Sequence, residues 1–344
     1  MIKHATIKDI AHALGISKST VSRALADHYD VKPETKQLVM EMAEKMNYRP
    51  NPYAQNLIRR RSKVIGVVVP EFVNSFFPRI IIQIQRIFEK EGFTVLITQS
   101  GDSAEIERKN LKLLENSMVE GILISVAEQG RNDDYYRRLM EHGITNVFFN
   151  RPSKAVEAPR VVIDDALMAF FAVEHALYAN GTKRERPLHL MGPDTLFNSE
   201  MRYKGYRDAL VKHGIEPTAE TVVPCRDISR ECGFETMNAI LDGDRIPDVV
   251  FCFNDPLAIG AMKAIKCRGY RIPEEIAVMG FTESQSALLT EPALSSVAQP
   301  VEQIGETAAN LLLEKIQNPD APNRMVVLDA QINLRESTDL HPEK

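Results

Sequence analysis

Apolar residues recur at spacings of three and four through the first 48 residues, a pattern typical of short amphipathic helices. It predicts a first helix that begins after Thr6, which forms a pair resembling a capping box with Asp9, and that ends at Gly15. Ser17 is the expected cap of a second helix, KSTVSRAL. A third helix begins near Pro33. We expect it to turn Leu38, Val39, Met42, Ala43 and Met46 inward.

From residue 64 onward, short apolar runs alternate with amphipathic stretches. The runs have the length of buried strands, and the stretches between them have helical periodicity. Apolar strands between helices predict parallel sheets covered on both faces, and the remaining residues, about 280, are enough for two such lobes. The expected strands lie in VIGVVVP, FTVLITQS, GILISV, NVFFN, VVIDD, LHLMG, VVFCFND and IAVMGFT.

The two halves of the pattern also differ in charge. Residues 1–63 carry 12 Lys/Arg against 6 Asp/Glu, a net charge of +6, whereas the rest carries 30 against 41, a net charge of −11. Neutralisation of phosphates dominates the affinity of proteins for nucleic acid. A basic head on an acidic body therefore predicts that only the head contacts nucleic acid.

Several classes of protein are excluded by the sequence. No apolar run reaches the roughly 18 residues of a membrane-spanning helix, and the start MIKHATIKDI lacks the apolar segment of an export signal. We therefore expect a cytoplasmic protein with no membrane partner. Cys225, Cys232, Cys252 and Cys267 form no C-x-x-C pair and have no histidine pair nearby, so we expect reduced thiols and no metal site.

No catalytic set is found either. The chain has no G-x-S-x-G, no Walker A motif, no H-E-x-x-H and no G-x-G-x-x-G that opens a helix. Asp164 and Asp165 are adjacent at a strand end, which is more typical of helix caps than of an acid/base couple. We expect no enzyme, no catalytic residues and no cofactor.

The strongest motif is TIKDIAHALGISKSTVSRAL, which has the spacing of a helix-turn-helix. The second helix of such a unit fits the major groove of DNA, where its N-terminal side chains face base edges. Any three-helix bundle shares this apolar periodicity. The basic charge, the Ser17 cap and Arg23 favour DNA binding.

The same segment, followed by NYRPNPYAQNL, FCFNDPLAIGAMKAI, IAVMGF and the late AQP, resembles the LacI/GalR family of bacterial transcription regulators over nearly the whole chain. The resemblance implies an N-terminal all-α helix-turn-helix head and an α/β two-lobed body like the periplasmic binding proteins, with a ligand cleft between the lobes. The expected domains are the head at 1–48, a hinge or linker helix at 49–62, an effector-binding N-lobe at 63–162 and 293–324, and an effector-binding C-lobe at 163–292 and 325–340.

The resemblance also implies which residues contact an operator. Lys18 and Ser19 match the two positions that usually discriminate between operators. Arg23 is the better candidate for guanine, and a phosphate contact is its alternative. Ala26 stands where the family commonly has Asn, which puts one contact in doubt. The matching residues of the head are Thr6, Ser17, Lys18, Ser19, Thr20, Ser22 and Arg23.

The stretch AQNLIRR resembles the hinge helix of the family, which folds on the operator and inserts one leucine from each subunit into the minor groove. Leu57 matches that leucine, and packing under the body is the alternative. A paired hinge requires a homodimer, and the lack of an appended leucine heptad favours a dimer over a tetramer. The other matching residues are Asn51, Ala54 and Gln55.

Candidate effector-binding residues stand where strands end, because ligands of such folds bind at the carboxyl ends of strands. Phe76 and Phe77 could stack on a sugar, or could divide between cleft and core. Each of the other residues has a plainer interpretation as a cap or an ion pair. They are Asn150, Arg151, Arg202, Asn254, Thr282 and Gln299.

Two positions depart from the family. Asn150 and Thr282 stand where relatives usually have Asp, whose carboxylate holds sugar hydroxyls. Their loss leaves Arg151 and Arg202 less neutralised, so we expect an effector that carries its own negative charge, such as a uronate or a phosphorylated sugar. Ile228, where some relatives have a stacking aromatic residue, also argues against a simple hexose.

These observations predict a transcriptional regulator that binds double-stranded operator DNA as a homodimer and responds to a small-molecule effector, a sugar or sugar derivative. A repressor relieved by its ligand is the favoured form, and a regulator with a corepressor or an activator is the alternative. A sugar-binding receptor whose head is accessory is the rival from another class, and a doubly wound enzyme is a more distant one.

Overall fold

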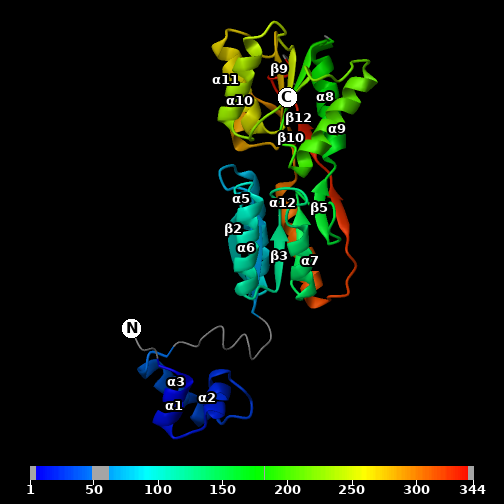
Figure 1. Cartoon of the computed structure of the whole chain (residues 1–344). Coiled ribbons are helices and arrows are strands. Elements are labelled where there is room, and N and C mark those ends of the chain that lie inside the picture. The colour runs from blue at the N-terminus through cyan, green and yellow to red at the C-terminus, as the bar shows by residue number, and fades with distance from the viewer. Residues whose placement is uncertain (1–4, 49–61, 182, 340–344) are drawn as a thin grey trace. The chain divides into compact units, whose positions relative to one another are not determined.

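The computed structural model describes residues 5–48, 62–181 and 183–339, which belong to two compact units divided between Ser62 and Lys63. The first unit is the head and the second is the body (Figure 1). Among the described residues, no helix is both long and apolar enough to cross a membrane.

The head consists of three short helices, as its periodicity predicts. They are α1 (Ile7–Leu14), α2 (Lys18–Leu25) and α3 (Pro33–Lys45). Ile10, Val21 and Val39 are fully buried between them. The expectation for Leu38 is wrong, because its side chain is 55% exposed. Val39 and Ala43, one helical turn apart, define the buried stripe of α3, and so small a bundle has no room to bury the neighbouring position as well.

The first lobe of the body is a parallel six-stranded sheet in the order β11-β5-β4-β3-β1-β2. Side chains alternate between its faces: Ile65, Val67 and Val69 pack against α5 and α12, and Val68 packs against α6. The elements are β1 (Val64–Val69), α5 (Phe76–Lys90), β2 (Thr94–Gln99), α6 (Ala104–Asn116), β3 (Gly121–Ile124), α7 (Asp133–Glu141), β4 (Thr145–Phe149), β5 (Arg160–Ile163), α12 (Val301–Gln317) and β11 (Met325–Leu328).

The second lobe repeats this arrangement in the order β12-β10-β9-β8-β6-β7, with only β12 antiparallel. Helices α8 and α9 cover one face and α10 and α11 the other (Figure 1). The elements are α8 (Asp165–Tyr178), β6 (Pro187–Met191), α9 (Phe197–Lys212), β7 (Val222–Pro224), α10 (Arg230–Leu241), β8 (Val249–Cys252), α11 (Asp255–Cys267), β9 (Ala277–Phe281), β10 (Ser295–Ala298) and β12 (Gln331–Asn333).

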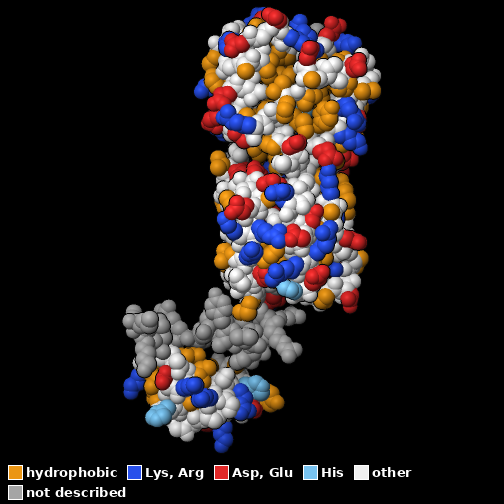
Figure 2. Space-filling view, in the orientation of Figure 1, with side chains coloured by type: hydrophobic (Ala, Val, Ile, Leu, Met, Phe, Trp, Pro, Cys, Tyr) orange, Lys and Arg blue, Asp and Glu red, His pale blue; other side chains and the backbone are white. Residues whose placement is uncertain are grey.

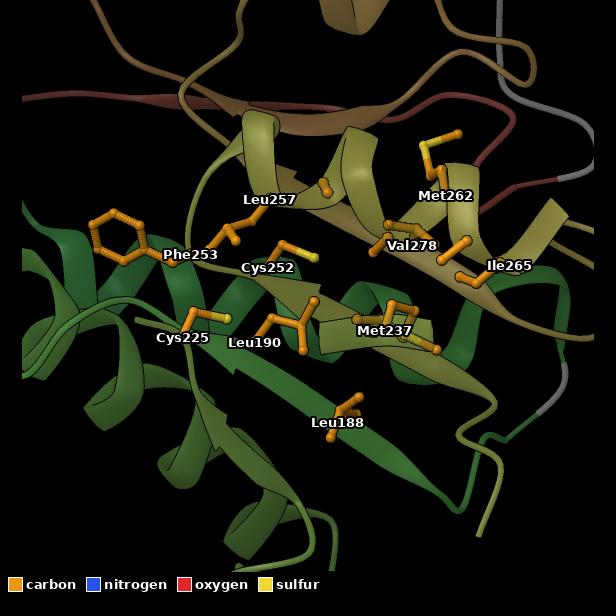
Figure 3. Packing of buried hydrophobic residues seen from close by; sticks show 14 of the residues in the cluster. Leu188, Leu190, Cys225, Met237, Cys252, Phe253, Leu257, Met262, Ile265 and Val278 are labelled. Carbon is orange, nitrogen blue, oxygen red and sulfur yellow. The ribbon is translucent and has the colours of Figure 1, made fainter. Parts of the chain in front are cut away.

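The core beneath α10 and α11 joins apolar residues of β6, β8 and β9 to the two helices, with Leu190, Met237 and Val278 among them (Figure 3). Cys225 and Cys252 pack inside this core as small apolar residues. Both carry free thiols, and burial raises the pKa of Cys225 to about 12. These thiols contribute packing to the lobe.

Two short strands correct the lobe boundaries that we expected. β10 lies in the second sheet, although 293–324 was expected in the N-lobe, and β11 lies in the first sheet, although 325–340 was expected in the C-lobe. Strands of four residues carry too little pattern to show which sheet they join. The chain crosses between the lobes after β5, after β10 and again after β11.

Candidate nucleic-acid interface and ligand pocket

Helix α2 presents polar side chains on the surface of the head. Its N-cap is Ser17, whose Oγ accepts a hydrogen bond from the backbone N–H of Thr20 at 3.1 Å, as predicted. Lys18, Ser19 and Arg23 are exposed, and Thr20 and Ser22 are partly buried. The head also carries Lys and Arg side chains over its surface (Figure 2). Its exposed polar groups can therefore reach base edges and phosphates.

Two predicted residues of the head have local structural contacts. Thr6 donates to Asp9 Oδ2 through its backbone N–H at 2.8 Å and its hydroxyl at 2.7 Å, which closes the start of α1. Arg23 Nη1 donates to Asp30 Oδ2 at 2.7 Å, and His28 Nδ1 lies 2.7 Å from Asp30 Oδ1. The contact with Asp30 could not be expected from the pattern of α2, since this residue lies in the loop beyond the helix. The predicted hinge residues Asn51, Ala54, Gln55 and Leu57 lie outside the described residues.

The strand ends of the two lobes meet around one pocket. The space there that no protein atom fills, including its opening to solvent, is about 620 Å³. All eight predicted effector-binding residues line it: Phe76, Phe77, Asn150, Arg151, Arg202, Asn254, Thr282 and Gln299. Their convergence follows from the parallel strands, because the carboxyl ends of such strands lie at one edge of each sheet.

Both arginines that the sequence predicts in the pocket are paired, so the reason for expecting an effector with its own negative charge is wrong. Arg202 Nε donates to Asp165 Oδ1 at 2.8 Å, its Nη1 donates to the Phe253 carbonyl oxygen at 2.5 Å, and the guanidinium lies 3.7 Å from the ring centroid of Phe281. Burial raises the pKa of Asp165 and lowers that of Arg202, and their mutual attraction opposes both shifts. Arg151 Nη1 donates to Asp102 Oδ1 at 2.5 Å. Asp164, in contrast, caps α8 as predicted.

One wall of the pocket has a backbone of unusual conformation. Thr282 and Glu283 have φ angles of 116° and 54°, in the region where residues other than glycine are strained. Asp255 holds this wall, since its carboxylate accepts hydrogen bonds from the Ser284 backbone N–H at 2.5 Å and from Ser296 Oγ at 2.6 Å. Burial raises the pKa of Asp255, and these hydrogen bonds oppose the rise. Across the pocket, Asn150 also has a positive φ of 58°.

Several buried polar atoms of residues that line the pocket have no hydrogen-bond partner among the described residues. They belong to Asn198, Ser284 and Gln299, whose amide lacks a partner at both Nε2 and Oε1. Buried polar groups are seldom left unpaired in proteins, and these atoms are themselves buried beneath the surface of the pocket. Phe76, Ile228 and Phe253 add apolar surface to the lining, whereas Phe77 is 97% buried and belongs mainly to the core.

The sequence missed part of the lining, although signals were present. Asn198 lies one helical turn before Arg202 on α9, so it shares the face of a predicted residue. Ser284 lies two residues beyond Thr282. Within the described ranges, no group of three or more His, Cys, Asp or Glu side chains is arranged to hold a metal ion. The further lining residues are Glu71, Asn74, Ser75, Arg79, Asn198, Ile228, Phe253, Pro256, Glu283, Ser284 and Val301.

Comparison with known proteins gives consistent similarities along the chain. Residues 6–51 match the profile of bacterial regulatory proteins of the lacI family, and residues 175–338 match a periplasmic binding protein-like domain. The chain is 30% identical to the HTH-type transcriptional repressor CytR of Escherichia coli strain K12, over 98% of this chain and 97% of that protein. It is 26% identical to catabolite control protein A of Priestia megaterium, over 97% and 99% of the two chains.

Solved structures show the same arrangement. The lac repressor dimer bound to operator and the anti-inducer ONPF superposes with a TM-score of 0.80 at 23% identity, over 98% of this chain and 99% of that one, a likeness of fold. The complex of the transcriptional regulator CelR with cellobiose has a TM-score of 0.73 at 26% identity, over 97% and 99%. A regulator from Enterococcus faecium with bound ribose has a TM-score of 0.68 at 26% identity, over 82% and 100%.

Proposed function

The chain belongs to the lacI family of bacterial regulatory proteins, and we propose that it is a cytoplasmic transcriptional repressor. Its affinity for an operator is controlled by a small molecule that binds in the pocket between its lobes. The observation that carries the proposal is the convergence of both lobes on one pocket, whose lining includes the polar side chains of Asn150, Asn254 and Gln299. The helix-turn-helix of the head, with Lys18, Ser19 and Arg23 exposed on α2, supports the operator-binding part.

Selection from random duplexes tests the operator-binding part. The full-length protein should enrich one sequence and bind it at least about a thousandfold more tightly than bulk DNA at physiological salt. Deletion of residues 1–61 should abolish duplex binding, which separates a regulator from a sugar receptor with an accessory head. A failure to prefer any duplex at low or moderate salt contradicts the proposal.

For the effector, we infer a neutral, polyhydroxylated molecule such as a sugar. The inference is supported by the pairing of Arg151 with Asp102 and of Arg202 with Asp165, which leaves neither arginine as an uncompensated charge for an acidic ligand. The amide of Gln299, a residue that lines the pocket, has both a donor and an acceptor, which suits hydroxyl groups. The cellobiose and ribose complexes of related regulators agree with this class.

Calorimetry with matched ligands tests this class. The affinities of the full-length protein for a neutral hexose, its uronate and its phosphate are compared. The measurement is repeated with a pentose and its acidic and phosphorylated derivatives. We expect the neutral member of each series to bind most tightly, because an added anion must be desolvated without a free cation to pair with. Tighter binding of the uronate or the phosphate would contradict this proposal and would favour the negatively charged effector that the sequence predicts.

The coupling of the two sites is reciprocal. A ligand that favours an arrangement of the lobes incompatible with operator binding must itself bind less tightly to the operator complex, by the same factor. We propose that the ligand weakens operator binding. Operator affinity measured with and without the ligand decides the sign, and a gain in affinity identifies a corepressor instead. Turnover of any sugar by the protein contradicts the absence of enzyme activity that we propose.

We further propose that the protein acts as a homodimer and that Leu57 of each subunit enters the minor groove. The lac repressor dimer on its operator supports the first part, and edge strand β2 with exposed Ile97 offers a surface for a second copy. Leucines inserted into the minor groove kink the duplex, and the contacts that offset the free energy of the kink form at the operator. Leu57→Ala should therefore lower affinity for the selected operator more than affinity for bulk DNA. Equal losses argue that Leu57 packs against protein instead.

A further inference from the structure

The end of the recognition helix carries an ion pair that operator binding does not by itself explain. Arg23 lies in the last turn of α2, and Asp30 follows seven residues later in the loop before α3. Their side chains are 48% and 35% exposed, so the pair lies at the surface. Neither residue belongs to the apolar core of the head. The pair therefore contributes little to the fold, because exposed ion pairs are screened by water and salt.

The guanidinium of Arg23 is held from two directions. Its Nε donates to the Ser19 backbone carbonyl oxygen at 3.3 Å, one turn earlier on α2, and its Nη1 donates to Asp30 Oδ2 at 2.7 Å. The other carboxylate oxygen of Asp30 lies 2.7 Å from His28 Nδ1, which fixes the carboxylate in turn. Partial desolvation raises the pKa of Asp30, but the hydrogen bonds from Arg23 and His28 outweigh it and lower the pKa overall.

We propose that Asp30 is a specificity-determining positioning residue, which orients Arg23 so that the remaining N–H donors of the guanidinium read a guanine in the operator. The inference rests on the proposed function of α2. A guanidinium carries five N–H donors, and two are enough for the O6 and N7 acceptors of guanine. Because Ser19 and Asp30 already restrict the side chain, less rotamer freedom is lost when the base contact forms.

The carboxylate also decides between the two partners that the sequence left open for Arg23. A phosphate is repelled by Asp30, which lies within hydrogen-bond distance of the same guanidinium. The O6 and N7 atoms of guanine carry no formal charge, so this repulsion does not apply to them. Asp30 therefore directs Arg23 away from the DNA backbone and toward base readout.

A charge-matched pair of variants tests the proposal. Asp27 lies on the same loop and is paired with Lys36 at 2.6 Å rather than with Arg23, so Asp27→Asn is the control for Asp30→Asn. Asn also tolerates the φ of 52° at position 27. The operator selected by the unmodified protein is changed one base pair at a time, and the affinity of the full-length variants for each duplex is measured. Arg23→Ala identifies the base pair that Arg23 reads.

Both Asn variants should bind all duplexes somewhat more tightly, because each removes one negative charge from the head. Only Asp30→Asn should also lower discrimination at the base pair assigned to Arg23, by about 3- to 10-fold, since a neutral amide is a weaker partner for the guanidinium. In an Arg23→Ala background, Asp30→Asn should leave base preference unchanged. Equal melting temperatures establish that the variants fold.

Two results overturn the proposal. If Asp30→Asn discriminates as well as Asp27→Asn, Asp30 does not position Arg23. If Asp30→Asn discriminates better than the unmodified protein, Asp30 competes with the base. Failure of the unmodified protein to select any operator is a different result, which contradicts the proposed function itself.

Discussion

The head and the body each contain an arginine–aspartate pair, and the two pairs have opposite surroundings. The side chains of Arg23 and Asp30 are 48% and 35% exposed, whereas those of Arg202 and Asp165 are 3% and 1% exposed. Water and salt screen the first pair, but loss of one partner of the second leaves a buried charge uncompensated. We therefore expect the same two residue types to control recognition in the head and folding in the body.

The largest effect is expected from Asp165→Ala, which leaves the buried Arg202 without its carboxylate. The free energy of unfolding of the body should fall by about 3 to 5 kcal/mol. Urea denaturation of the full-length protein, followed by circular dichroism, measures the change.

Asp164→Ala is the matched control, because it removes the neighbouring carboxylate, which accepts from the Leu167 backbone N–H at 2.9 Å as the cap of α8. Its loss should cost about 1 kcal/mol, the usual contribution of an N-cap. If Asp165→Ala and Asp164→Ala lower the free energy of unfolding equally, the buried ion pair contributes no more to stability than an ordinary helix cap.

A second large effect concerns the pH dependence of the body. His189 is fully buried on β6, its ring is stacked 4.9 Å from that of Phe251, and burial lowers its pKa to about 4. Between pH 6.5 and pH 4 the unfolded chain binds a proton at this residue and the folded chain does not. Stability should therefore fall as the pH is lowered through this window, by about 3 kcal/mol in all.

His189→Phe keeps an aromatic ring in the stack and removes the titrating group. The variant should lose stability less steeply than the unmodified protein between pH 6.5 and pH 4, and parallel curves would exclude His189 as a source of the slope. Urea denaturation at several pH values provides both curves.

A smaller effect is expected on operator affinity. Arg23→Ala should cost about 1 to 3 kcal/mol at the operator and should relax preference at one base pair, as for a bidentate contact with guanine. Lys18→Ala is compared with it on the selected operator and on bulk DNA. If both substitutions weaken every duplex equally, both side chains contact phosphate only.

The smallest effect completes the comparison. Asp30→Asn should leave the melting temperature of the head unchanged within the error of the measurement, because both partners of its ion pair are largely exposed. Thermal unfolding of the full-length protein, monitored in the head by a probe attached at an exposed site, checks this. A clear drop would give Asp30 a structural role comparable with that of Asp165.

Local signals made most of the head and much of the pocket predictable. Thr6, Gly15 and Ser17 set the limits of α1 and α2 through contacts within a few residues, so the sequence contains all that is needed. The pocket residues could be found because each follows an apolar strand, and parallel strands bring their carboxyl ends together. Whether these residues bind an effector remains a prediction.

The charge of the pocket was not predictable, because its partners come from distant parts of the chain. Asp102 lies 49 residues before Arg151, and Asp165 lies 37 residues before Arg202. No periodicity or spacing connects such positions. The same limit applies to β10 and β11, which are too short for their pattern to show which sheet they join.

The route of the chain through the body has a consequence for any shortened form of the protein. β11 covers the edge of β5 in one lobe, and β12 covers the edge of β10 in the other, although both lie within the last stretch of described residues. Removal of the chain from Met325 onward, by a protease or an early stop codon, would thus expose the edges of β5 and β10 together. Exposed edge strands can pair with strands of other chains. We therefore expect such fragments to aggregate rather than to remain folded and functional.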